Sequence, residues 1–159
     1  AQENNGKNLF LTLPIFDANS VRTGGGLGCN ACHRAPEFDI DPQSKSNGIG
    51  GSINGGPDFT NTRAPSLRNL VNTSGVVNGP MMHTAVINDL QTAIGHYGNL
   101  TNAANNNTNL DGRLKPNGVN GQQLQLSAQE VNAVIAFLKT LSGTDVYTNT
   151  KWSNPFPSN

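Results

Sequence analysis

The chain has 159 residues, enough for one domain with a hydrophobic core. Its ten basic and ten acidic residues give no net charge, which does not suit a protein that binds nucleic acid by neutralising phosphates. Apolar residues make up 35% and charged residues 13%, yet 36 residues are Leu, Ile, Val or Phe, so full disorder is excluded. No apolar run approaches the roughly 18 residues of a membrane-spanning helix, so we expect no membrane span.

Two short helices are predicted in the first half of the chain, with a long loop between them. Apolar residues at near-helical spacing predict a helix over residues 3–12, which Pro14 ends. Repeated Asp-Pro, Asn-Gly and Gly-Pro turn signals predict mostly loop over residues 36–64. Because so long a loop is unusual in a compact domain, it favours a large ligand that the chain wraps. A second helix is predicted over residues 65–72, with Pro65 in its first position.

The second half of the chain predicts two more helices. Apolar spacing indicates a helix over residues 88–97 that Asn88 could cap. Residues 101–123 are rich in Asn and Gly and predict an irregular segment. Ser127 and Glu130 form a capping box before an apolar stripe, which is the clearest helix signal in the chain. Since no segment alternates apolar and polar residues over a useful length, we expect an all-α domain of four to five short helices and long loops.

The two cysteines, Cys29 and Cys32, lie in a Cys-x-x-Cys-His motif that ends at His33. This motif is the attachment signature of c-type haem (heme c). Two thiols at this spacing can lie on one helical turn and add to the two vinyl groups of the porphyrin. The next residue, His33, then lies under the iron as its proximal ligand. The motif therefore predicts one covalently bound haem.

Two other interpretations of the cysteines stay open. Half of a zinc site has the same spacing, but a second pair of ligands at matching spacing is missing from the sequence. A redox dithiol has it too, but such a motif begins a helix within a strand–helix–strand pattern, which this sequence lacks. Haem attachment is the favoured interpretation, and a colourless zinc-binding interaction domain is its rival.

A second axial ligand is expected from the loop that carries both methionines of the chain, Met81 and Met82, just before His83. A thioether is a soft ligand that suits haem iron and raises its reduction potential. Methionine also fills irregular gaps in cores, but an adjacent pair between Pro80 and His83 favours ligation. From the spacing alone, either methionine or His83 could reach the iron.

Other side chains could bind charged groups. Arg63 and Arg68 flank Pro65, and since a guanidinium group matches a carboxylate, we expect one of them to bind a haem propionate. Asp39, Asp41 and Asp58 could offer oxygens to Ca²⁺. The sequence has no calcium-binding loop of the common kind, so a polar surface rich in turns is the favoured interpretation of these carboxylates.

Several segments, taken in order, resemble the C-terminal, electron-transferring haem domain of bacterial di-haem cytochrome c peroxidases and their MauG-like relatives. The segments are 28–33, 62–70, 79–83, 96–97 and 134–141, and the resemblance runs from about residue 23 to residue 156. It implies a cytochrome c-like domain over residues 1–159, wrapped around the haem. It also implies that His33 and Met82 are the two metal ligands, that Arg63 lies close to the haem, and that calcium binds partly through backbone oxygens.

This sequence departs from that family in one respect that bears on activity. The peroxidases carry two Cys-x-x-Cys-His motifs and this chain has one, so the half that holds the peroxidatic haem is absent. An iron capped by Met82 has no vacant position for peroxide. We therefore expect a monohaem c-type cytochrome that passes single electrons between redox protein partners. Two alternatives are a peroxidase-like enzyme whose sixth position opens and a haem sensor in which Met82 gives way to a small gas.

The haem prediction carries a prediction of location. Haem attachment and oxidising surroundings belong outside the cytoplasm, so we expect a bacterial periplasmic or cell-surface protein. The chain begins at Ala1 with no targeting segment, as expected after removal of an export signal or for a shortened chain.

Overall fold

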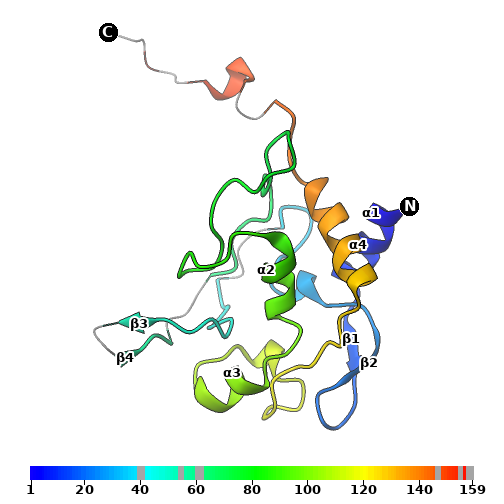
Figure 1. Cartoon of the computed structure of the whole chain (residues 1–159), viewed down its shortest axis with the longest axis vertical. Coiled ribbons are helices and arrows are strands. Elements are labelled where there is room, and N and C mark those ends of the chain that lie inside the picture. The colour runs from blue at the N-terminus through cyan, green and yellow to red at the C-terminus, as the bar shows by residue number, and fades with distance from the viewer. Residues whose placement is uncertain (39–41, 54–55, 60–62, 146–147, 154–155, 157–159) are drawn as a thin grey trace.

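A computed structural model gives the fold and describes residues 1–38, 42–53, 56–59, 63–145, 148–153 and 156. Helices α1 (Gln2–Leu11) and α4 (Ala128–Lys139) come from opposite ends of the sequence and pack side by side (Figure 1). Both were predicted, and both are confirmed. No helix in these ranges is long and apolar enough to cross a membrane, in agreement with the composition.

The two helices approach closely at Gly6 of α1. A Cβ atom at this position would collide with the Ala133 carbonyl of α4, so only glycine permits the approach. Beside this crossing, the rings of Phe10, Phe38 and Phe137 pack edge to face with centroids 5.3 to 5.8 Å apart. Phe10 is 1% exposed, so the crossing forms the centre of the core.

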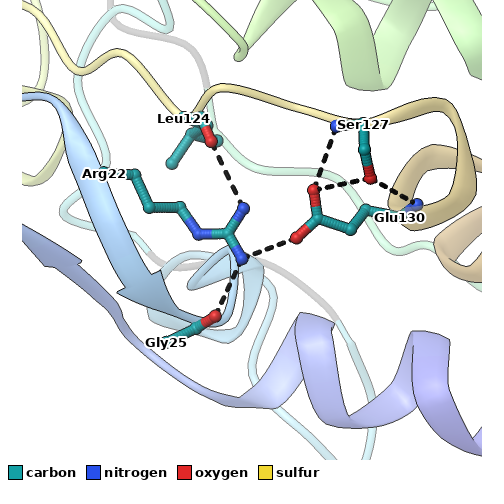
Figure 2. Close-up of polar contacts among 5 residues, drawn as sticks. All are labelled: Arg22, Gly25, Leu124, Ser127 and Glu130. Carbon is teal, nitrogen blue, oxygen red and sulfur yellow. Dashed lines mark hydrogen bonds and ion pairs between the residues drawn. The ribbon is translucent and has the colours of Figure 1, made fainter.

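The start of α4 is tied to the segment before the cysteine motif. The predicted capping box is present: the Ser127 hydroxyl accepts from the Glu130 amide, and the Glu130 carboxylate accepts from the Ser127 amide. Arg22 donates to the same carboxylate at 2.7 Å and also to the carbonyls of Gly25 and Leu124 (Figure 2). The guanidinium group therefore joins β2 (Arg22–Gly25) to the N-terminus of α4.

Two short antiparallel hairpins correct the expected fold class. Strand β1 (Pro14–Phe16) pairs with β2 (Arg22–Gly25), and β3 (Ser52–Ile53) pairs with β4 (Gly56–Pro57). The expectation of an all-α, cytochrome c-like fold is therefore wrong. Strands of two to four residues are too short to show an alternating pattern, and their pairing depends on the turns that join them.

The helices of the middle of the chain also differ from expectation. Helix α2 (Leu90–His96) was predicted, but its N-cap is Asp89, whose carboxylate accepts from the Thr92 amide at 2.7 Å, rather than Asn88. Helix α3 (Thr101–Asn106) lies in a segment predicted to be irregular. Three short 3₁₀ turns complete the described elements: η1 (Cys29–Ala31), η2 (Gly112–Leu114) and η3 (Thr150–Trp152).

The helix predicted over residues 65–72 is absent. Its backbone amides bond to distant segments instead: Leu67 donates to the Phe38 carbonyl, and Asn69 donates to the Leu141 carbonyl. Asn69 also has a φ of 58°, a left-handed conformation that no α-helix contains. Two of the apolar residues at helical spacing, Leu67 and Leu70, still pack against the core, although the segment is not helical.

Candidate functional site

The cysteine motif forms a single tight turn directly after the first hairpin. Gly28 begins η1 with a φ of 70°, and a Cβ there would lie 2.7 Å from the Pro14 ring. The amides of Cys32 and His33 both donate to the Cys29 carbonyl, at 3.2 and 2.9 Å. No disulfide joins Cys29 and Cys32. One turn of the backbone therefore carries both cysteines, with His33 next in the chain, as predicted.

The surroundings of Cys29 keep its thiol neutral. Cys29 packs against the core formed by α1 and α4. Burial raises the pKa of Cys29 to about 12, with a smaller contribution in the same direction from neighbouring Cys32. At neutral pH the turn therefore presents a protonated thiol that is a poor ligand for a free metal ion, because thiolate is the ligating form.

The imidazole of His33 is oriented by a backbone carbonyl. Its Nδ1 lies 3.0 Å from the Pro65 oxygen, and because a carbonyl only accepts, Nδ1 carries the proton and donates. Burial lowers the pKa of His33, against the opposing effect of this hydrogen bond, so the ring is neutral at pH 7. The Nε2 lone pair is left available. Ligating histidines are oriented in this way, so His33 fits the role of an axial ligand to haem iron.

Met82 is the first residue of a turn closed by an antiparallel bridge between Met81 and Ile87. The Met81 amide donates to the Ile87 carbonyl at 2.6 Å, which commits the Met81 backbone to the bridge. Met82 has a φ of 66°, and its carbonyl accepts from the Ala85 amide at 3.0 Å. The two methionines therefore differ in their backbone surroundings: Met81 is part of the bridge, and Met82 begins the turn.

Two residues connect Met82 to the cysteine turn. The Asn47 side-chain amide lies 3.2 Å from the Met82 sulfur and 3.4 Å from the Tyr97 hydroxyl. Burial raises the pKa of Tyr97 to about 12, and the neighbouring Cys32 and Cys29 raise it further, while the Asn47 hydrogen bond opposes this. Asn47 and Tyr97 therefore link Met82 to the neighbourhood of the two cysteines.

Two of the other side chains predicted for the site, Arg68 and His83, pair with acidic residues of the chain. Arg68 forms an ion pair with Glu37 at 2.6 Å and donates to the Pro36 carbonyl, and its side chain is half exposed. Arg63 is exposed. The His83 Nε2 lies 3.3 Å from the Asp58 carboxylate, which gives His83 a partner other than a metal. A propionate contact for either arginine stays a prediction.

Sequence reasoning missed an ion pair behind the cysteine turn. Arg113 donates to the Ala31 carbonyl at 3.0 Å and pairs with Asp111 at 2.6 Å. These two residues, with Arg34 and Lys45, line a cavity of about 460 Å³. Neither Arg113 nor Asp111 belongs to a recognisable motif, and they lie about 80 residues from the turn in sequence, so no local signal could have found them.

Calcium and zinc are not tested by the described residues. Asp39 and Asp41 lie outside them, and Asp58 pairs with His83. Within the described ranges, no group of three or more His, Cys, Asp or Glu side chains lies together as a metal site would require. The calcium expectation stays a prediction.

Comparison with solved structures finds a similar fold. It is similar to the crystal structure of a MauG-like protein associated with microbial copper homeostasis, with a TM-score of 0.52 and 22% sequence identity. The match covers 97% of this chain and 50% of that chain, so this chain spans about half the length of its structural relative. No protein-family model and no curated protein matches the chain. The likeness is one of fold, and it agrees in part with the resemblance to MauG-like proteins noted in the sequence.

Proposed function

We propose that this chain binds one c-type haem through thioether bonds to Cys29 and Cys32 and works as a single-electron carrier. His33 is the proximal ligand and Met82 the distal ligand in this proposal. The observation that carries it is the His33 hydrogen bond to the Pro65 carbonyl, which leaves Nε2 available as a ligand directly after two cysteines on one turn that no disulfide joins. The MauG-like structural relative supports a haem-related function.

The haem, when bound, supplies an iron that cycles between ferric and ferrous states. The chain's own residues hold and surround it. The Pro65 carbonyl keeps the proton of His33 on Nδ1, and the Asn47 amide keeps the Met82 sulfur in place. Leu67, Ile94 and Tyr97 pack against the same core as Cys29 and limit the access of water to it. Ligands held rigidly in this way favour electron transfer, because little has to move when the charge changes.

The cellular setting follows from the cofactor. Covalent haem attachment places the protein in a bacterial periplasm or at a cell surface, with a redox protein as electron donor or acceptor. The rival function is a peroxidase-like haem domain. It is favoured by the MauG-like relative, about half of whose length this chain spans. Ligation by Met82 argues for the electron carrier, because a thioether on the iron blocks peroxide.

The first experiment is visible absorption of the protein produced with haem-attachment machinery, in both oxidation states, with Met82→Ala beside Met81→Ala. We expect covalent haem and a low-spin spectrum with the weak long-wavelength band of a thioether on ferric haem. Met82→Ala should abolish that band and allow CO to bind the ferrous form, whereas Met81→Ala should keep the band. A wild-type protein that is high-spin or binds CO readily would favour the enzyme or sensor, and one without haem would favour the zinc domain.

A further inference from the structure

We propose that Asn47 is a positioning residue whose side-chain N–H binds the Met82 sulfur and thereby raises the reduction potential of the bound haem. The inference rests on the proposed function, since it assumes that Met82 ligates the iron. It assigns a role in the site to a residue of the long loop, which the sequence analysis treated only as a turn signal. The hydrogen bond from Asn47 Nδ2 to Met82 Sδ, 3.2 Å long, is the observation from which it starts.

The orientation of the Asn47 amide is set by its other contacts. The Asn47 Oδ1 accepts from the Ile49 backbone amide at 3.1 Å, and a backbone N–H can only donate. The oxygen must therefore face Ile49, and the NH₂ group must face the opposite way. That group lies between the Met82 sulfur and the Tyr97 hydroxyl, both of which can accept.

The backbone around Asn47 is also held firmly. The Asn47 carbonyl accepts from His96 Nε2 at 2.9 Å, which attaches the loop to the end of α2. Ser46, only 1% exposed, exchanges backbone bonds with Asn109 and Asp111, and its hydroxyl accepts from Asn107 at 2.7 Å. A residue clamped on both sides in this manner can hold a donor at a constant distance from a sulfur atom.

The effect on the potential follows from the chemistry of a thioether. A thioether sulfur is a weak acceptor, and an N–H that bonds to it draws electron density from its lone pairs. The sulfur then stabilises ferric iron less, so the ferrous state gains and the reduction potential rises. Hydrogen bonds around the ligands are among the means by which proteins set the potential of haem. Removing the Asn47 donor should lower the potential.

The test compares Asn47→Leu and Asn47→Ala with Asn102→Leu, a control on the exposed face of α3. Leu fills the volume of Asn and Ala leaves space, so a shift of the same sign in both variants reports the lost donor rather than packing. We expect a lower midpoint potential and a shifted thioether band in both, and no change in the control. In wild-type ferrous protein, we also expect NMR to show side-chain amide protons of Asn47 that exchange slowly with solvent, a readout that needs no variant.

The outcomes separate this inference from the proposed function. A wild-type protein that lacks the thioether band overturns both. A wild-type protein with the band, whose potential moves no more in the Asn47 variants than in Asn102→Leu, overturns the role of Asn47 alone. Fast solvent exchange of the Asn47 amide protons in the wild type overturns it as well, even where both variants fail to fold.

Discussion

Asp111 places a carboxylate behind the cysteine turn, where it is 5% exposed. Desolvation raises the pKa of Asp111, but hydrogen bonds from the Arg113 side chain and from the Lys45 and Arg113 amides, with the Arg113 charge, outweigh it and hold the pKa at about 2. Arg113 in turn donates to the Ala31 carbonyl between the two cysteines. The pair therefore supports the backbone that presents both thiols.

The first prediction follows from the lowered pKa of Asp111. A carboxyl whose folded-state pKa lies below its ordinary 3.8 stabilises the fold above pH 3.8, and this stabilisation is lost as the pH falls toward about 2. Asp111→Asn should lower the Tm at pH 7, and the difference from wild type should shrink between pH 4 and pH 2. Thermal unfolding followed by circular dichroism across this range measures it.

Glu37→Gln is the control for this prediction. It removes a carboxylate from an ion pair whose side chains are 59% and 54% exposed, where such pairs contribute about 0 to 1 kcal/mol. A Tm difference for Asp111→Asn that stays constant from pH 7 to pH 2 would show that the charge of Asp111 does not stabilise the fold.

At the scale of single residues, sequence reasoning predicted the site residues that belong to a short motif and missed those brought in by contacts between distant parts of the chain. The spacing of Cys29, Cys32 and His33 predicted one turn, because three residues so close in sequence have few alternatives. Asn47, Tyr97 and Arg113 entered the site only through contacts across 35 to 82 residues of sequence. Nothing near Asn47 and Arg113 in the sequence distinguishes them from other loop residues, whereas Tyr97 lies in segment 96–97 of the resemblance.

At the scale of elements, the crossing of α1 and α4 depends on the absence of one side chain. An exposed glycine inside a helix costs about 1 kcal/mol relative to alanine. Gly6 lies inside α1, but it is buried and faces the Ala133 carbonyl, which is backbone and cannot rotate away. The steric term therefore decides the sign of a substitution there.

The second prediction is that Gly6→Ala destabilises the protein despite the better helix propensity of alanine. Overpacking of a well-packed core typically costs about 1 to 3 kcal/mol, which exceeds the gain in propensity. Gly95→Ala in α2 is the matched control, because a Cβ at Gly95 would meet nothing within 4 Å. It should stabilise the protein by about 0.5 to 1 kcal/mol. Urea unfolding measures both, and a stabilised Gly6→Ala would disprove the close approach.

The third prediction concerns the Asn-rich segment after α2. Asn107 is 5% exposed, and its amide donates to the Ser46 hydroxyl at 2.7 Å while its oxygen accepts from the Asn109 amide. Asn107→Ala should therefore destabilise the protein by about 1 to 3 kcal/mol, because it leaves a buried hydroxyl and a buried amide with one partner fewer. Asn105→Ala, at an exposed position of α3, should be neutral or slightly stabilising. Equal effects of the two substitutions in urea unfolding would contradict this role.

Elements with strong local signals were predicted well, and those that depend on tertiary contacts were not. The capping box and apolar stripe of α4 are sufficient to specify a helix from the local sequence alone. Helix α3 is rich in Asn, a poor helix former, and its Ala103 packs near Gly48 of the long loop. The hairpins depend on turns, and residues 65–72 are drawn out of a helix by bonds to Phe38 and Leu141. Local periodicity contains none of these contacts.

At the scale of the whole molecule, the longest helices and the residue proposed as the distal ligand, Met82, lie in different parts of the chain. Helices α1 and α4 form one packed unit near the two ends of the chain (Figure 1). The described residues from 63 to 89 contain no helix or paired strand longer than an isolated bridge, yet they supply Met82. Individual hydrogen bonds hold this part of the chain: the bond of Met81 to Ile87 closes its turn, and the bond of Asn47 to Met82 attaches the turn to the long loop.

The last prediction follows from this distribution and concerns hydrogen exchange. Segments with few buried contacts open at low free energy, and a ligand that binds only the closed form suppresses the opening. If haem joins His33 to Met82, its attachment should slow amide exchange at residues 80–85 far more than in α1 and α4, whose packing does not depend on it. The comparison is haem-loaded wild type against Cys29→Ala/Cys32→Ala, which lacks both attachment thiols. Exchange that slows equally in all segments would mean that haem binding and global folding are one transition, and exchange that slows only near η1 would mean that residues 80–85 do not reach the haem.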